Sequence, residues 1–430
     1  MKQHIGVDLA PLRISREYRR LYVAGFITAL GSQATYVTIP YQLKQLTHSP
    51  FDVGALGLFE LVPLIVFGLY GGVLADRMNR RRLIITMEVL LMIATGIVLM
   101  NALLPHPQVW ILYADAVVAA AVSSVQRPSI EALNQAFVPH DLQRAASALA
   151  NIRYTTASII GPALGGLVAV SAGPGIVYGA NLVTFALSLF LLSGLAQQVP
   201  PAPHGDNDRA ALRAGLSFLR SRPDIVGTYI IDLLAMTFAF PVAMLPFVAA
   251  RFHSSYALSL LYCGLPTGAL IFTVLSGWTR RVRHYGRGVV FAATLWGLGI
   301  ALFGFSSSLW LVLVGLAIAG GADSLSGIFR STMWNESIPS DIRGRMAGME
   351  MISYSLGPTA GQFRAGVMAA WTSLRFSLTF GGLACSGSVA VVGAALPSLW
   401  HFDSRSDVNV AMVRELRSRE EHLGESEETP

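Results

Sequence analysis

Charged residues are scarce in this chain of 430 amino acids. Only 13% of its residues are Asp, Glu, Lys or Arg, 53% are hydrophobic, and the mean hydropathy is +0.54. Because soluble domains carry about 25% charged residues, this composition excludes an ordinary soluble protein. Cysteine is scarce too. Cys263 and Cys385 both fall inside apolar stretches, so the sequence predicts no disulfide framework.

Motifs of several enzyme classes are missing as well. The chain has no Walker pattern, which argues against ATP hydrolysis. It has neither a metal-ligand cluster nor a nucleophile elbow, and its nine histidines are scattered. We therefore expect no enzyme, no bound metal and no cofactor.

The chain does have twelve long apolar runs, each long enough for a membrane-spanning helix of about 20 residues. They lie at 21–43, 53–75, 83–104, 109–131, 146–170, 175–198, 225–250, 256–278, 288–306, 308–329, 346–371 and 375–398. The runs are too long for the alternating strands of an outer-membrane barrel, and the first lacks the cleavage site of a signal peptide. The sequence predicts an all-α polytopic membrane protein with twelve transmembrane helices in a lipid bilayer.

Basic residues concentrate at one set of helix ends and so predict the orientation. The loops of the opposite set carry only Lys44, Arg251 and Arg375. By the positive-inside rule, both termini lie in the cytoplasm. The net charge of +6 is then a topology signal, and it requires no nucleic-acid partner.

The two halves of the chain resemble each other. The stretch 138–142 (Val-Pro-His-Asp-Leu) recurs as 338–342 (Ile-Pro-Ser-Asp-Ile), and each copy is followed by Gly-Pro-x-x-Gly. Internal repeats of this kind are typical of secondary transporters. We predict two pseudo-symmetric six-helix bundles joined by a loop with an amphipathic segment and followed by a charged tail. The four parts are 1–198, 199–224, 225–400 and 401–430.

Two motifs carry a family resemblance over residues 16 to about 400. The first is Gly72-x-Leu74-x-Asp76-Arg77-x-x-Arg80-Arg81, and the second is Gly161-Pro162 with Gly165 and Gly166. The first resembles the signature between helices two and three of the major facilitator superfamily, although Asn79 replaces a usual glycine. The second is similar to the helix-five motif of its antiporters. Asp115 stands where the family usually has an arginine.

Stretches such as Thr47-His48-Ser49 and Asn101-Ala102-Leu103-Leu104-Pro105 further resemble the bacterial exporters of siderophores such as enterobactin. The resemblance implies export of an amphipathic small molecule across the bacterial inner membrane by alternating access, with the proton gradient as energy source. Multidrug or macrolide efflux, a lipid or solute uptake carrier, and a non-transporting scaffold remain alternatives. We expect a monomer, with an outer-membrane exit channel as a partner.

The first motif predicts a conformational latch at the cytoplasmic face. Asp76 would face the positive N-terminal end of a helix in the other half, and Arg77 and Arg80 would pair with Glu131 or Asp141. The alternative is that these arginines only anchor the topology. The predicted latch consists of Gly72, Asp76, Arg77, Arg80, Arg81, Glu131 and Asp141.

Charged side chains inside predicted spans are the other candidates, because each costs at least about 2.5–3.5 kcal/mol in lipid. The candidates for coupling or substrate contact are Asp232, Asp323, Glu60, Asp115, Arg127 and Arg330. Asp232 and Asp323 rank first as proton carriers, with Glu60 next, whereas Arg127 and Arg330 suit structural pairing or an anionic substrate. Static ion pairs are the alternative for the acids. The glycines of the helix-five motif predict either close packing or a bend that limits ion leakage.

Overall fold

The computed structural model describes residues 8–196, 217–338 and 340–408, together with 410–413, 415 and 418; within these, the side chains at 69–77, 280 and 340–354 are not described. The helices of the first half are α1 (Ala10–Ile14), α2 (Arg16–Thr47), α3 (Pro50–Arg77), α4 (Arg80–Ala102), α5 (Val109–Phe137), η1 (His140–Leu142), α6 (Gln143–Ser171) and α7 (Pro174–Ser193). Those of the second half are α9 (Pro223–Ala239), η2 (Val242–Met244), α10 (Leu245–Ala250), α11 (Ala257–Leu275), η3 (Ser276–Arg281), α12 (Tyr285–Phe305), α13 (Leu309–Ser337), α14 (Ser340–Trp371), α15 (Leu374–Ala395) and α16 (Pro397–Trp400).

The fold class predicted from the sequence is confirmed. Within the described residues, ten helical segments are long and apolar enough to cross a membrane. Helices α2 and α14 each have 32 residues, which is also long enough to span, although their sequences are more polar. Helices are expected in a bilayer because each satisfies its own backbone hydrogen bonds there.

One predicted run is not a continuous helix. The apolar stretch 225–250 is broken after Ala239, where Phe240 takes an extended conformation before Pro241, and the chain resumes as η2 and α10. Proline disfavours the helical conformation in the residue that precedes it. The stretch Pro223–Ala250 is still long and apolar enough to cross a membrane, as predicted, but hydropathy alone does not register the break inside it.

By their internal contacts, the residues form two compact units. Unit 1 contains residues 1–204, 241–266 and 362–374, and unit 2 contains residues 205–240, 267–361 and 375–430. Helices α11 and α14 are therefore each divided between the units. Parts of the second half of the chain thus belong to the same compact unit as the first six long helices.

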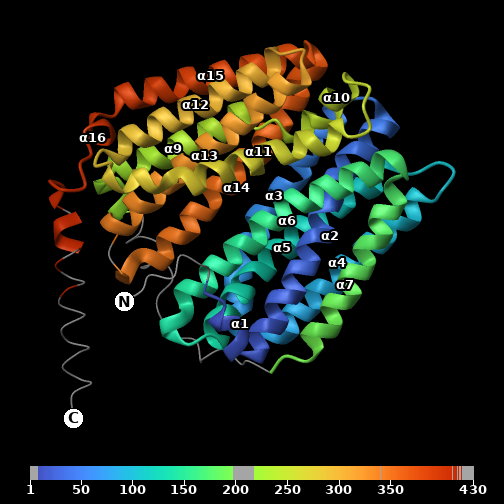
Figure 1. Ribbon diagram of the computed structural model, residues 1–430, viewed down its shortest axis with the longest axis horizontal. Helices are drawn as coiled ribbons and strands as arrows, with labels where there is room; N and C mark the ends of the chain where they lie inside the picture. Colours follow the sequence, from blue (N-terminus) through green and yellow to red (C-terminus); the bar gives the residue numbers. More distant parts are fainter. Residues whose placement is uncertain are drawn as a thin grey trace. The chain divides into compact units, whose positions relative to one another are not determined.

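In unit 1, α2 is the central helix. It packs against α5, α6 and α7, while α4 packs against α5 and α7, and these helices lie side by side in Figure 1. A core of apolar side chains fills one end of the unit, formed by Leu21, Ala24, Ile84, Leu133, Leu192 and Leu195. Polar side chains lie further along α2, and they shape the cavity described below.

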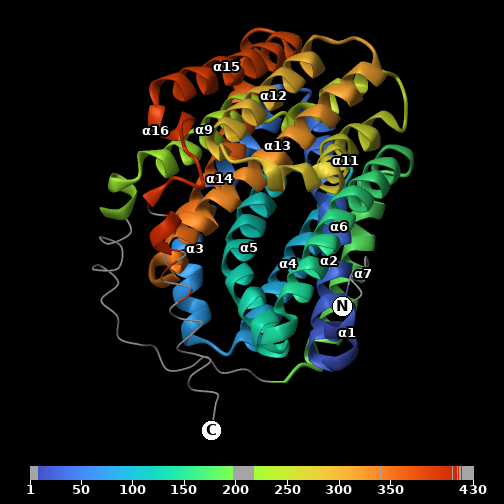
Figure 2. The same cartoon turned by 60° about the vertical axis from the view of Figure 1, so that its left-hand side comes forward.

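In unit 2, α12 is the central helix and lies beside α13 and α15 (Figure 2). Small residues allow the close approach. A Cβ atom at Gly299 of α12 would lie 2.8 Å from the carbonyl oxygen of Gly315 on α13, and one at Gly297 would lie 2.6 Å from the carbonyl oxygen of Gly382 on α15. Glycine at these positions permits the backbone contact typical of membrane helices.

Candidate functional site

Unit 1 contains a cavity of about 230 Å³ that is lined by both polar and apolar side chains. Helices α2, α3, α4, α5 and α7 supply its walls, and Gln362 of α14 closes it from the second half of the chain. The lining residues are Ser32, Gln33, Thr35, Tyr36, Ile39, Pro40, Leu56, Glu60, Leu91, Thr95, Asp115, Ala116, Ala119, Ser123, Asn181, Phe185 and Gln362. The lining of the cavity therefore offers hydroxyl, amide, carboxyl, aromatic and aliphatic groups.

Two carboxyl groups line this cavity. Glu60 comes from α3 and is half-buried, and Asp115 comes from α5 and is only 8% exposed. Within the part of the chain that the structure describes, neither forms a hydrogen bond or an ion pair, and they are near enough for their charges to repel. None of the lining residues, all of which are described, is basic. This geometry favours a proton or a cationic group in the cavity.

Hydrogen bonds to α7 fix the face that α2 presents to the cavity. Tyr178 donates its hydroxyl proton to Gln42 Oε1 at 2.7 Å, and Asn181 donates from Nδ2 to Thr35 Oγ1 at 2.9 Å. These buried bonds hold α2 in one rotational setting, so that Tyr36 points toward the cavity. Tyr36 meets Tyr262 of α11 edge-on, with ring centroids 6.5 Å apart.

A second charged cluster lies in unit 2. Asp232 of α9 and Arg330 of α13 form an ion pair between Oδ1 and Nη1, with side chains only 5% and 11% exposed. Asp323 lies two turns before Arg330 on α13, close enough to interact electrostatically with both. Trp334 donates from Nε1 to Thr228 at 3.0 Å and stacks on Tyr229, which fixes α13 against α9 beside the pair. The structure therefore brings together three residues predicted as separate candidates.

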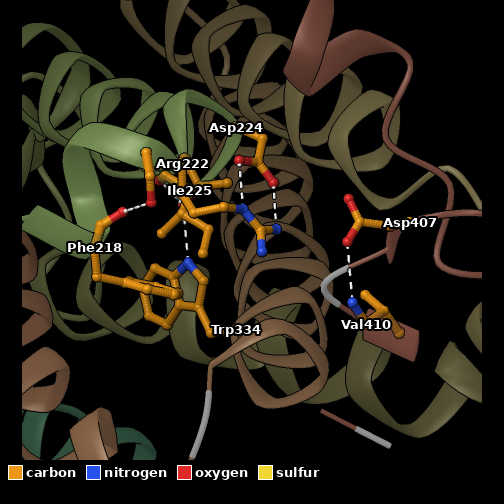
Figure 3. Close-up of polar contacts among 9 residues, drawn as sticks. Phe218, Arg222, Asp224, Ile225, Trp334, Asp407 and Val410 are labelled. Atoms are coloured by element: carbon orange, nitrogen blue, oxygen red, sulfur yellow. Dashed lines mark hydrogen bonds and ion pairs between the residues drawn. The ribbon is translucent and has the colours of Figure 1, made fainter. Parts of the chain in front are cut away.

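The start of α9 holds a buried ion pair that sequence reasoning missed. Arg222 donates to both carboxylate oxygens of Asp224, at 3.0 and 2.7 Å, and the two residues are 4% and 5% exposed (Figure 3). The sequence signal for this pair was the aspartate two residues after the arginine, because a bidentate Arg–Asp pair can be buried.

The structure describes the side chains of only part of the predicted latch. Gly72, Asp76 and Arg77 fall in the stretch whose side chains are not described. Arg81 donates to the backbone carbonyl of Ser193 at the end of α7. Asn79, which departs from the family motif, caps α4 by accepting hydrogen bonds from the backbone of Arg81 and Arg82.

The two acids that were predicted to pair with Arg77 or Arg80 are both exposed. Glu131 forms an exposed pair with Arg127 one turn earlier on α5, at 3.3 Å. Asp141 lies exposed in η1. Among the described residues, Arg80 forms an ion pair with neither acid. The latch stays a prediction.

The glycines of the helix-five motif let α6 contact α2 and α11 closely. A Cβ atom at Gly165 would lie 2.5 Å from Ala34 Cα, and one at Gly161 would lie 2.6 Å from Gln33 Cβ. Gly166 faces Ser259 of α11 instead, since a Cβ atom there would lie 2.9 Å from the Ser259 hydroxyl oxygen. Pro162 lies inside the helix, which continues through it.

In the second half, the glycine that corresponds to Gly161 makes a corresponding contact between helices. A Cβ atom at Gly357 of α14 would lie 2.6 Å from Met236 Cβ on α9. Gly161 and Gly357 occupy the same place in the two Gly-Pro-x-x-Gly sequences. Each motif thus packs against the first long helix of its own half, which agrees with the repeat seen in the sequence.

Glu88 of α4 is a further buried acid, 2% exposed. It accepts hydrogen bonds from Thr28 Oγ1 at 2.5 Å and from Gln126 Nε2 at 2.9 Å. Because these donors are on α2 and α5, the carboxyl joins three helices of unit 1. Nothing in the sequence around Glu88 identifies these partners.

Comparison with known proteins identifies the family of this chain. A family model described as a transmembrane secretion effector matches residues 7–416. The enterobactin exporter EntS of Shigella boydii serotype 18 is 30% identical over 354 residues, which is 81% of this chain and 84% of the exporter. EntS of Escherichia coli O139:H28 has the same identity and coverage.

Solved structures agree on the fold. The nucleoside transporter NupG gives a TM-score of 0.69 at 14% identity, covering 90% of this chain and 100% of that chain. A D-xylose-proton symporter gives 0.71 at 14% identity, covering 90% and 98%. The chain is a secondary transporter of small molecules and a multi-pass membrane protein, and it is not an enzyme. It belongs to the transmembrane secretion effector family, within the major facilitator superfamily.

Proposed function

We propose that this protein exports an amphipathic small molecule, with a siderophore such as enterobactin as the first candidate, across the bacterial inner membrane by proton antiport. The observation that carries the proposal is the pair of acids, Glu60 and Asp115, in a cavity whose lining is partly apolar and contains no basic residue. The 30% identity to enterobactin exporters supports the direction and the substrate class.

Protonation of the cavity acids would supply the coupling. A carboxyl group that is exposed to water in one conformation of the transporter and buried in another can take up a proton on one side of the membrane and release it on the other. Two carboxyl groups within reach of each other resist being charged together. Proton binding and binding of a polar substrate group would then compete for the same pair.

Asp232 and Asp323 become the second pair of candidates in this proposal. Arg330 already forms an ion pair with Asp232, so a change of protonation there would also break a buried interaction. This fits a structural or gating role for the cluster better than a free exchange of protons. Among the described residues Asp323 forms no ion pair, so it is the acid of the cluster that could exchange a proton without breaking one.

Efflux of cationic drugs is the alternative that a specific observation favours. Two acids without a base attract a protonated amine and repel an anion, and Tyr36 and Phe185 offer aromatic surface beside them. Macrolides and other amphipathic amines match this chemistry. The orientation with both termini in the cytoplasm, and closure of the latch at that face, belong to both proposals.

The test compares cavity variants with matched controls in two assays. In a deletion strain of the source organism, we expect reduced siderophore secretion, or reduced drug tolerance if the alternative holds. In proteoliposomes with an imposed pH difference, Glu60→Gln and Asp115→Asn should each lower proton-driven transport at least tenfold while substrate counterflow continues. Asp8→Asn, which changes an exposed acid of the same unit outside both the cavity and the predicted latch, is the control and should transport normally.

Two results would contradict the proposal. Normal secretion together with unchanged drug tolerance in the deletion strain would remove both substrate classes. Undiminished pH-driven transport by both cavity variants would instead show that coupling resides elsewhere, with Asp323→Asn as the next variant to measure.

A further inference from the structure

We propose that unit 2 carries a binding site for an anionic glycerophospholipid at the start of α12. The site would hold the lipid phosphate at Arg281, Arg283 and Arg287, and one acyl chain along Phe291 and Leu295. It lies outside the transport cavity of unit 1, and it does not depend on the substrate proposed above.

The site is a groove of about 610 Å³. Its lining changes from basic to apolar along its length: Trp278, Arg281, Val282, Arg283, His284, Arg287, Gly288, Phe291, Ala292, Leu295, Leu325 and Phe329. The basic residues come from η3 and from the segment that leads into α12. The apolar residues continue along α12 and α13. A phospholipid has the same order of groups, with a charged head followed by hydrocarbon.

The three arginines are available to an anion. Arg281 and Arg283 are exposed, and within the described residues none of the three forms an ion pair. Arg287 is held in place, because it donates from Nε to the carbonyl of Trp400 at 3.0 Å and lies 5.5 Å from the centroid of the Trp400 ring. In the part of the chain that the structure describes, the remaining guanidinium donors of Arg287 have no hydrogen-bond acceptor, so they can bind a ligand.

Helix polarity adds to the positive charge at this end of the groove. Helix α12 begins at Tyr285 and has 21 residues, so the positive end of its dipole lies beside the segment that carries Arg281 and Arg283. The acids nearby have other contacts. Glu336 accepts from the Tyr285 hydroxyl at 3.5 Å, Asp403 accepts from the backbone of Arg405, and Asp407 from the backbone of Val410.

The apolar end distinguishes a lipid from free phosphate. Phe291 is 64% exposed and Leu295 is 38% exposed, on a helix that crosses the bilayer. Trp278 is 50% exposed and meets Phe329 edge-on, with centroids 6.2 Å apart, at the boundary between the charged and apolar parts. Aromatic rings at this depth are typical of the headgroup region. Basic pockets at membrane-helix ends bind anionic headgroups.

The experiment measures lipid selectivity of the purified full-length protein in detergent. Dioleoyl phosphatidylglycerol and dioleoyl phosphatidylcholine are added in equal amounts, and native mass spectrometry gives the ratio of the two bound lipids. We expect the wild-type protein to prefer phosphatidylglycerol at least tenfold. Each arginine near a membrane surface contributes about fivefold in affinity for an anionic lipid.

The main variant is the double substitution Arg281→Gln with Arg283→Gln, because both side chains are exposed and the fold does not depend on them. It should weaken phosphatidylglycerol binding about 25-fold and abolish most of the preference. The matched control replaces Arg220 and Arg375 with Gln. These are two exposed arginines of the same unit outside the groove, and their loss should leave the ratio unchanged.

A second readout places the acyl chain. Phosphatidylglycerol with brominated chains should quench tryptophan fluorescence, and Trp278→Phe should reduce that quenching. The proposal is overturned if the wild-type protein binds both lipids equally, if the Arg281/Arg283 variant keeps its preference, or if Trp278→Phe leaves the quenching unchanged. Displacement of the lipid by millimolar inorganic phosphate would assign the site to phosphate and would overturn it as well.

Discussion

The buried pair between Asp232 and Arg330 allows a sharp prediction, because the third charge beside it makes the two single substitutions unequal. Removing one partner of a buried ion pair costs about 3–5 kcal/mol in free energy of unfolding. Arg330→Gln leaves two neighbouring acids, Asp232 and Asp323, without the cation that interacts with both. Asp232→Asn leaves Arg330 with Asp323 as a remaining acid.

We therefore expect Arg330→Gln to destabilise the protein by about 3–5 kcal/mol and Asp232→Asn by clearly less. The double variant should cost less than the sum of the two, since it leaves no unmatched member of the pair. Coupling energies of about 0.5–3 kcal/mol are usual for side chains in contact. The measurement is denaturant or thermal unfolding of the purified protein in one mild detergent.

Arg127→Gln is the control for this cycle. It also breaks an ion pair, with Glu131, but those side chains are 55% and 63% exposed, so the loss should stay below about 1 kcal/mol. Two outcomes would refute the reasoning: additive effects in the double variant, or a larger loss from Asp232→Asn than from Arg330→Gln.

Two other substitutions test the packing of unit 1. Gly165→Val should reduce the amount of folded protein or destabilise it by about 1–3 kcal/mol, because a Cβ atom there would meet the backbone of Ala34, whereas Gly179→Val on α7 has open space and should be tolerated; equal effects would argue against the α2–α6 contact. Glu88→Gln should cost about 1–3 kcal/mol in unfolding experiments, because an amide cannot accept from two donors through both of its terminal atoms. A loss no greater than that of Arg127→Gln would show that the buried hydrogen bonds of Glu88 contribute little.

Much of the fold was predictable because the bilayer restricts the choices. A long apolar run in lipid must form a helix to satisfy its backbone, so the runs at 83–104 and 175–198 correspond to α4 and α7. The motif Gly161-Pro162 predicted close packing, since only small residues let two helix backbones approach. The break at Phe240 was hidden, because hydropathy averages over the residues that cause it.

The sequence by itself determined the class of protein, the number of long apolar segments, the repeat and the identity of the ionisable groups. Only the tertiary structure decided which of those groups face each other. Arg330 is paired with Asp232, Glu60 shares a cavity with Asp115, and Glu88 is held by hydroxyl and amide donors. Helical periodicity fixes a side chain's position along its own helix, whereas its partner depends on how neighbouring helices are rotated and packed, which is a property of all their contacts together.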